Sequence, residues 1–104
     1  MRPSEAIETY RNEIIQIVRR NSGQNVRVFG STIRGEDTES SDLDLLIDPT
    51  ATTSLFSIAK MELELSRLLE ARVEIKTPNG LPKHFRQEVI NQAYPLKTQE
   101  QEQL

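Results

Sequence analysis

The apolar positions of the chain recur with two different spacings, and the longer spacing predicts helices. Between residues 4 and 20 apolar side chains recur every three or four positions, which predicts an amphipathic helix that ends at the turn-forming residues 21–23. The same spacing predicts a helix over residues 53–70 and a last helix that begins near Pro82. The side chains that this last helix is expected to turn inward are Phe85, Val89 and Ile90.

The shorter spacing, in which apolar and polar residues alternate, predicts strands over residues 25–29, 42–48 and 72–76. Helices and strands then follow one another along the chain, which predicts a domain of the α/β (α+β) class with a small mixed β-sheet backed by helices. A length of 104 residues fits one domain. We expect this domain over residues 1–96, followed by a polar tail over residues 97–104.

The alternation also indicates which side chains share a face of the sheet. In the second strand every other residue is apolar, and Asp42 and Asp44 lie on the opposite side. In the third strand Glu74 likewise alternates with apolar neighbours. If the helices cover the apolar face, the sequence predicts three carboxylates together on the open face.

Composition narrows the chemistry that these carboxylates can support. The chain has no cysteine and a single histidine, His84, which excludes thiolate zinc sites and histidine clusters. A net charge of −3 gives no broad basic surface, so we expect no direct binding to nucleic acid. No apolar run is long enough for a membrane span or a signal peptide, and we therefore expect a cytoplasmic protein without a membrane partner.

The pair Asp42 and Asp44 is a candidate metal site. Their side chains leave a strand about 6–7 Å apart, so both reach one ion, and their mutual repulsion favours a divalent cation between them. Mg²⁺ prefers such oxygen ligands. Glu74 as a third acid would permit a second ion at about 3.5–4 Å from the first.

Gly30 and Ser31 form a candidate phosphate site. They directly follow the predicted strand 25–29, where glycine lets the backbone approach a ligand closely and where amides and a hydroxyl can donate to phosphate oxygens. A phosphate site next to paired carboxylates implies a metal-bound nucleoside triphosphate.

These residues resemble a known family. Gly30-Ser31, then ten residues, then Asp42-Leu43-Asp44 is similar to the signature of the polymerase β-like nucleotidyltransferase superfamily, and the wider string and the short chain resemble its minimal nucleotidyltransferase branch. Small members of this branch commonly act as antitoxins paired with a HEPN-domain ribonuclease toxin. The resemblance implies a minimal nucleotidyltransferase fold with an open metal-binding face.

The resemblance also implies a role for each matching residue. Gly30, Ser31 and Arg34 would bind the nucleotide, and Asp42 and Asp44 would be catalytic and hold Mg²⁺. Glu74 occupies the place of the third catalytic and metal-binding carboxylate, which is commonly aspartate in the family. The reaction implied is transfer of AMP from ATP to a hydroxyl, and in HEPN-associated antitoxins to a tyrosine of the toxin.

Other interpretations of the same residues stay open. The chain could be a non-catalytic antitoxin that neutralises its toxin by binding, or a nucleotidyltransferase that acts on a small molecule or RNA. Glu74 could be one of the solvated charges of an open face, and Arg34 could pair with Glu36 or Asp37 instead of a phosphate. We place His84 outside the site.

Overall fold

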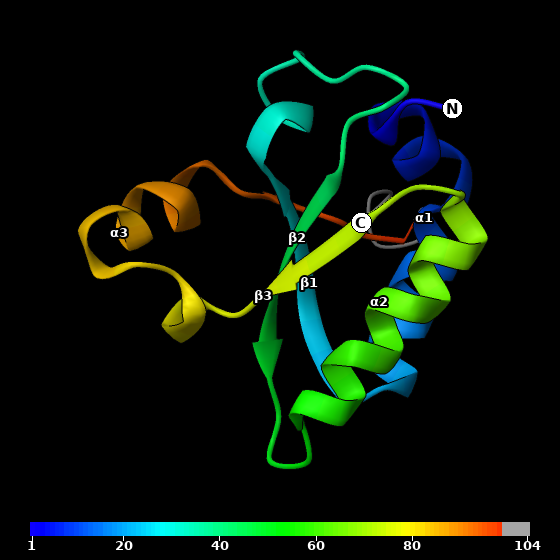
Figure 1. Ribbon diagram of the computed structural model, residues 1–104. Helices are drawn as coiled ribbons and strands as arrows, with labels where there is room; N and C mark the ends of the chain where they lie inside the picture. Colours follow the sequence, from blue (N-terminus) through cyan, green and yellow to red (C-terminus); the bar gives the residue numbers. More distant parts are fainter. Residues whose placement is uncertain (99–104) are drawn as a thin grey trace.

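The computed structural model of the chain describes residues 1–98 and contains three α-helices around one sheet in that range (Figure 1). The elements in chain order are α1 (Pro3–Arg20), β1 (Gly23–Phe29), the 3₁₀ turn η1 (Gly30–Thr32), β2 (Leu43–Pro49), α2 (Leu55–Leu69), β3 (Val73–Lys76), the 3₁₀ turn η2 (Pro78–Gly80), α3 (Lys83–Gln92) and β4 (Tyr94–Pro95).

The sheet is mixed, as predicted. Its strand order is β3-β2-β1-β4, with β2 and β3 parallel and the other neighbours antiparallel. Helices α1 and α2 lie side by side and cover one face of the sheet, whereas α3 lies on the other side (Figure 1). This arrangement confirms the predicted class, a small mixed sheet backed by helices.

The hydrophobic core lies between the sheet and the pair α1 and α2. Alternate residues of β2 point into it, and Leu43, Leu45 and Ile47 are fully buried. The α2 helix begins at Leu55, two residues after the predicted start, because the Ser54 side chain caps it by accepting a hydrogen bond from the backbone N–H of Ser57. The opposite face of β2 is covered only in part: Leu46 is fully buried, Asp44 is half-buried, and β2 contacts η2.

The prediction that α3 turns its apolar side chains inward is wrong. This helix contains no buried residue, Phe85 is 37% exposed, and Val89 and Ile90 are only half-buried. The reason is that α3 packs beside the turns η1 and η2 instead of over the core, so its short apolar stripe meets few partners.

The end of the described chain adds a strand that the sequence did not predict. In β4, Tyr94 pairs with Val28 and Pro95 with Arg27. Two residues are too few to show an alternating pattern. The buried Leu96 follows and donates its N–H to the Val26 carbonyl at 2.9 Å, so the chain is still part of the fold at the boundary that we predicted after residue 96. Most of the predicted tail, residues 99–104, lies outside the described residues.

No helix among residues 1–98 combines the length and the apolar character that crossing a membrane requires.

Candidate functional site

The turn at Gly30 lies directly against the carboxylate of Asp44. Strands β1 and β2 pair so that Phe29 is opposite Asp44, and the chain leaves β1 one residue later at Gly30. Gly30 has a φ angle of +82°, and a Cβ atom added to it would lie 2.5 Å from Asp44 Oδ2. Only glycine fits this position, because any side chain would displace the carboxylate. The pairing of two strands therefore joins the candidate phosphate site to the candidate metal site.

The segment after Gly30 is a tight turn whose backbone bonds to itself. The N–H of Ile33 donates to the Gly30 carbonyl at 3.2 Å, and the N–H of Glu36 donates to the Ser31 carbonyl at 3.0 Å. These bonds fix the backbone around Ser31, which is half-buried. Ser31 is thus the next residue after the contact between Gly30 and Asp44.

Asp44 is placed where negative charge is unfavourable. Its pKa is raised above the ordinary aspartate value, first because burial removes water from the carboxylate and then because Glu74 and Asp42 repel it. The opposing charges of Lys76 and Arg34 offset this only in part. The carboxylates of this face therefore carry an excess of negative charge that a bound cation would relieve.

The three predicted acids lie on one side of the sheet, but their carboxylates do not converge on one position. Asp44 and Glu74 are directly opposite each other in the parallel pair β2 and β3, and Asp42 precedes β2 by one residue and is exposed. Glu74 Oε1 forms an ion pair with Arg72 Nη2 at 3.1 Å. Within residues 1–98, no three acidic or histidine side chains are gathered as they are around a bound metal.

Arg34 forms an ion pair with Glu36, which is one of the two interpretations that the sequence left open for it. Its Nε atom donates to Glu36 Oε1 at 2.9 Å, and both side chains are more than half exposed. Such an exposed pair contributes at most about 1 kcal/mol, so the guanidinium can change partners at little cost. Arg34 nevertheless lies near the site, because it lines the cavity beside Gly30 and its charge opposes the rise in the pKa of Asp44.

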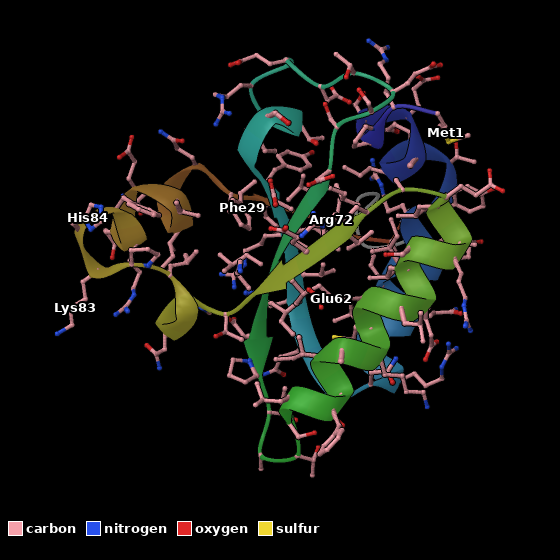
Figure 2. The ribbon with its side chains drawn as sticks, in the orientation of Figure 1. Met1, Phe29, Glu62, Arg72, Lys83 and His84 are labelled. Atoms are coloured by element: carbon pink, nitrogen blue, oxygen red, sulfur yellow. The ribbon has the colours of Figure 1, made fainter. Side chains whose placement is uncertain are left out.

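Lys76 is a cation of the site that the sequence interpretation missed. It lies two residues after Glu74 on β3, it is exposed, and its charge acts on Asp44 more strongly than that of Arg34. The available signal was the alternation of β3, which puts Lys76 on the same face as Glu74. His84, which lies outside the predicted site, is exposed at the start of α3 (Figure 2). Its ring is nearly perpendicular to that of Phe85, with 4.6 Å between the ring centroids.

A cavity of about 230 Å³ opens beside the Gly30 turn, between η1 and α3. Its lining comprises Phe29, Gly30, Ile33, Arg34, Val89 and Gln92. Phe29, which is labelled in Figure 2, is the last residue of β1 and lines the cavity. The cavity therefore adjoins the candidate phosphate site through Gly30.

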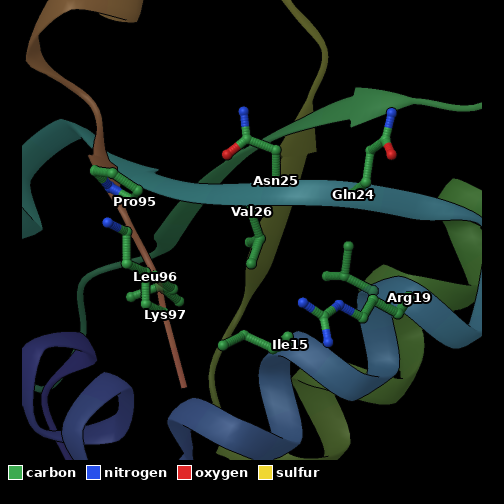
Figure 3. A pocket seen from close by; sticks show the side chains of 9 residues that line it. Ile15, Arg19, Gln24, Asn25, Val26, Pro95, Leu96 and Lys97 are labelled. Atoms are coloured by element: carbon green, nitrogen blue, oxygen red, sulfur yellow. The ribbon is translucent and has the colours of Figure 1, made fainter. Parts of the chain in front are cut away.

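A second cavity, of about 320 Å³, lies between α1, β1 and residues 95–97 (Figure 3). Its walls include Ile15, Arg19 and Asn25 and contain none of the predicted site residues. Its position on the α1 side of β1 separates it from Gly30 and Asp44, at the other end of that strand.

Several known proteins are similar to this chain in sequence. The family model for polymerase β nucleotidyltransferases matches residues 12–102. A candidate protein adenylyltransferase of Methanocaldococcus jannaschii is 36% identical over 78 residues, which are 75% of this chain and 80% of that protein. The protein adenylyltransferase MntA of Thermococcus cleftensis is 33% identical over 69 residues, which are 66% of this chain and 70% of that protein.

Solved structures extend the likeness to three dimensions. A structure described as a candidate minimal nucleotidyltransferase superposes with a TM-score of 0.80 at 38% identity, and the match covers 89% of this chain and 95% of that one. A crystal structure of a variant toxin–antitoxin complex of MntA superposes with a TM-score of 0.67 at 25% identity, covering 88% and 76% of the two chains. A family match over nearly the whole chain, with the same fold and with Gly30 against Asp44, shows that the chain belongs to the polymerase β nucleotidyltransferase family.

Proposed function

We propose that this protein is a protein adenylyltransferase that transfers AMP from ATP to a hydroxyl of a partner protein. The observation that carries the proposal is the contact between the Gly30 turn and Asp44, which brings a phosphate site and a carboxylate site together. Membership of the nucleotidyltransferase family gives the reaction class, and the similar proteins named as protein adenylyltransferases favour a protein acceptor.

The proposed partner is a HEPN-type ribonuclease toxin, which makes this chain the antitoxin of a pair. Support comes from the similar toxin–antitoxin complex of MntA. The proposed acceptor is a tyrosine hydroxyl of the toxin, and its modification would silence the ribonuclease.

The residues present fit a bound Mg²⁺. Asp42 and Asp44 offer oxygen ligands, and the excess negative charge that raises the pKa of Asp44 is the charge that such an ion would offset. Glu74 is the proposed third ligand, once its carboxylate leaves Arg72. When bound, the ion supplies positive charge to the triphosphate oxygens and to the charge that develops at the α-phosphorus.

The chain's own residues then position the reactants. Backbone amides near Gly30 and the Ser31 hydroxyl donate to the triphosphate and fix it on the turn. The acceptor oxygen attacks the α-phosphorus, the bond between this phosphorus and the bridging oxygen breaks, and pyrophosphate leaves. The acceptor's proton passes to a carboxylate of the open face. Positioning of this kind is the main contribution of a protein to phosphoryl and nucleotidyl transfer.

The test is incubation with the partner toxin, ATP and Mg²⁺, followed by intact mass measurement of both chains. We expect adenylyl mass on the toxin, and none with the double variant Asp42→Asn, Asp44→Asn, whose side chains keep their shape but lose their charge. A stable complex without added mass, for any nucleoside triphosphate, would instead support an antitoxin that acts by binding alone.

A further inference from the structure

The cavity beside the Gly30 turn has the size and the walls of a site for one planar ring. Its volume of about 230 Å³ is below the about 300–1,000 Å³ of pockets that enclose a drug-sized ligand, so it holds a fragment of a nucleotide and not the whole. Phe29, Ile33 and Val89 supply apolar walls, whereas Arg34 and Gln92 supply polar atoms. Apolar walls with a few polar groups are the usual composition of a ligand site.

The position of the cavity relates it to the nucleotide. Gly30 contributes to its wall and also touches Asp44, so a triphosphate bound at the turn has the cavity on one side and the carboxylates on the other. Ile33, which directly follows η1, is 38% exposed and lines the cavity, so its apolar side chain is available to a ring bound there. The half-buried Val89 faces the same space from α3.

We propose that this cavity receives the purine base of the nucleotide and that Gln92 selects adenine over guanine. The proposal rests on the proposed function, because it assigns a specificity residue to the same site. It also gives a role to Val89, which is only half-buried on α3 and lines the cavity.

The chemistry of the glutamine amide fits one purine better than the other. A glutamine side chain donates through its amide nitrogen and accepts through its oxygen, and this pair matches N7 and the N6 amino group of adenine. Guanine presents two acceptors, N7 and O6, on the same edge, so the amide oxygen would meet another oxygen. A pyrimidine is smaller and leaves the apolar walls unfilled.

The experiment compares ATP with GTP in the wild type and in two matched variants. Gln92→Leu keeps the size of the side chain and removes both hydrogen-bonding atoms. Gln87→Leu is the control on the same helix, because Gln87 bonds to Asn91 at 2.8 Å on the exposed side and does not line the cavity. The readouts are kcat/KM for AMP and GMP transfer to the toxin, and the Kd of each nucleotide with Mg²⁺ by calorimetry on the chain alone.

We expect the wild type and Gln87→Leu to prefer ATP by about tenfold or more, and Gln92→Leu to lose most of this preference. The analogue 7-deaza-ATP, which lacks N7, should bind the wild type more weakly than ATP does. It should bind Gln92→Leu as well as ATP does. An unchanged ratio of ATP to GTP in Gln92→Leu, or a wild type without preference, would overturn the inference and leave the proposed transfer intact. Absence of transfer with every nucleotide would instead contradict the proposed function, and the Kd ratios would still decide the role of Gln92.

Discussion

The two sides of strand β2 show how one short segment serves stability and chemistry at once. On the side toward α1 and α2, Leu43 and Leu45 are fully buried among apolar neighbours. On the other side Asp44 is half-buried beside Glu74 and Asp42, where burial and repulsion raise its pKa. Adjacent residues therefore contribute to the free energy of folding with opposite signs. The apolar side chains of the core side stabilise the fold, whereas the carboxylates of the site side destabilise it and lie where a metal-bound nucleotide would need them.

The largest expected effect on folding lies on the core side. Leu45→Ala removes a fully buried side chain from the middle of the sheet and should lower the free energy of unfolding by about 2–5 kcal/mol. Chemical denaturation measures this change. AMP transfer per folded molecule should stay near that of the wild type, and a matching loss of transfer would show that the two sides are not separate. Ile47→Val, with an expected loss of about 0.5–1.5 kcal/mol, repeats the test if the first variant does not fold.

The largest expected effect on activity from a change outside the acids is at Gly30. Gly30→Ala places a methyl group on the Asp44 carboxylate, and we expect transfer to fall by about 100-fold or more because the phosphate turn and the acid must move apart.

Gly35→Ala is the matched control for this variant. Gly35 has a similar φ angle of +71°, but a Cβ atom there would meet nothing within 4 Å. Both variants share the backbone strain of a positive φ angle, so only Gly30→Ala should lose transfer. Equal losses in the two variants would contradict a special role for the contact with Asp44.

A smaller effect is expected at Lys76. Its ammonium group is the strongest cation acting on Asp44, and we expect it to offset charge on the triphosphate or on departing pyrophosphate. Lys76→Ala should lower kcat/KM for ATP by about tenfold, whereas the control variant Lys83→Ala should leave it unchanged, because Lys83 is also exposed but lies at the start of α3. Steady-state kinetics with varied ATP measures kcat/KM in both variants. Equal values in the two variants would show that Lys76 has no role in the site.

The parts of the fold that the sequence predicted are those with strong local patterns. The helices predicted over residues 4–20 and 53–70 and the strands predicted over residues 42–48 and 72–76 each lie within a few residues of their observed place. The alternation predicts Glu74 on the same face as Asp44, and the parallel register of β2 and β3 in the structure sets these two residues opposite each other.

The parts that could not be predicted depend on tertiary contacts. The contact of Gly30 with Asp44 follows from the antiparallel register of β1 and β2, which one strand alone does not reveal. The stripe of α3 looks the same whether it packs on the core or beside η1, so the cavity next to Gln92 was not foreseen. Strand β4 depends on pairing with β1 and has almost no pattern of its own.

Asp44 itself provides the most direct measurement, because it lies where the two sides of β2 differ most. Its folded-state pKa is raised, so the folded chain binds its proton more tightly than the unfolded chain does. Stability therefore falls as pH rises from the ordinary aspartate pKa through the raised value, and above that window the charged carboxylate destabilises the fold. Asp44→Asn removes this charge while keeping the shape of the side chain.

The decisive experiment measures AMP transfer and the unfolding midpoint of Asp44→Asn together, without and with Mg²⁺ and ATP, at acidic and neutral pH. We predict that transfer is lost, that the variant without ligand unfolds at a higher temperature than the wild type at neutral pH, and that this advantage shrinks in acid. We also predict that Mg²⁺ with ATP stabilises only the wild type. A variant that transfers AMP, or that is less stable than the wild type at neutral pH, would contradict the account of Asp44 as a carboxylate kept for catalysis at the expense of stability.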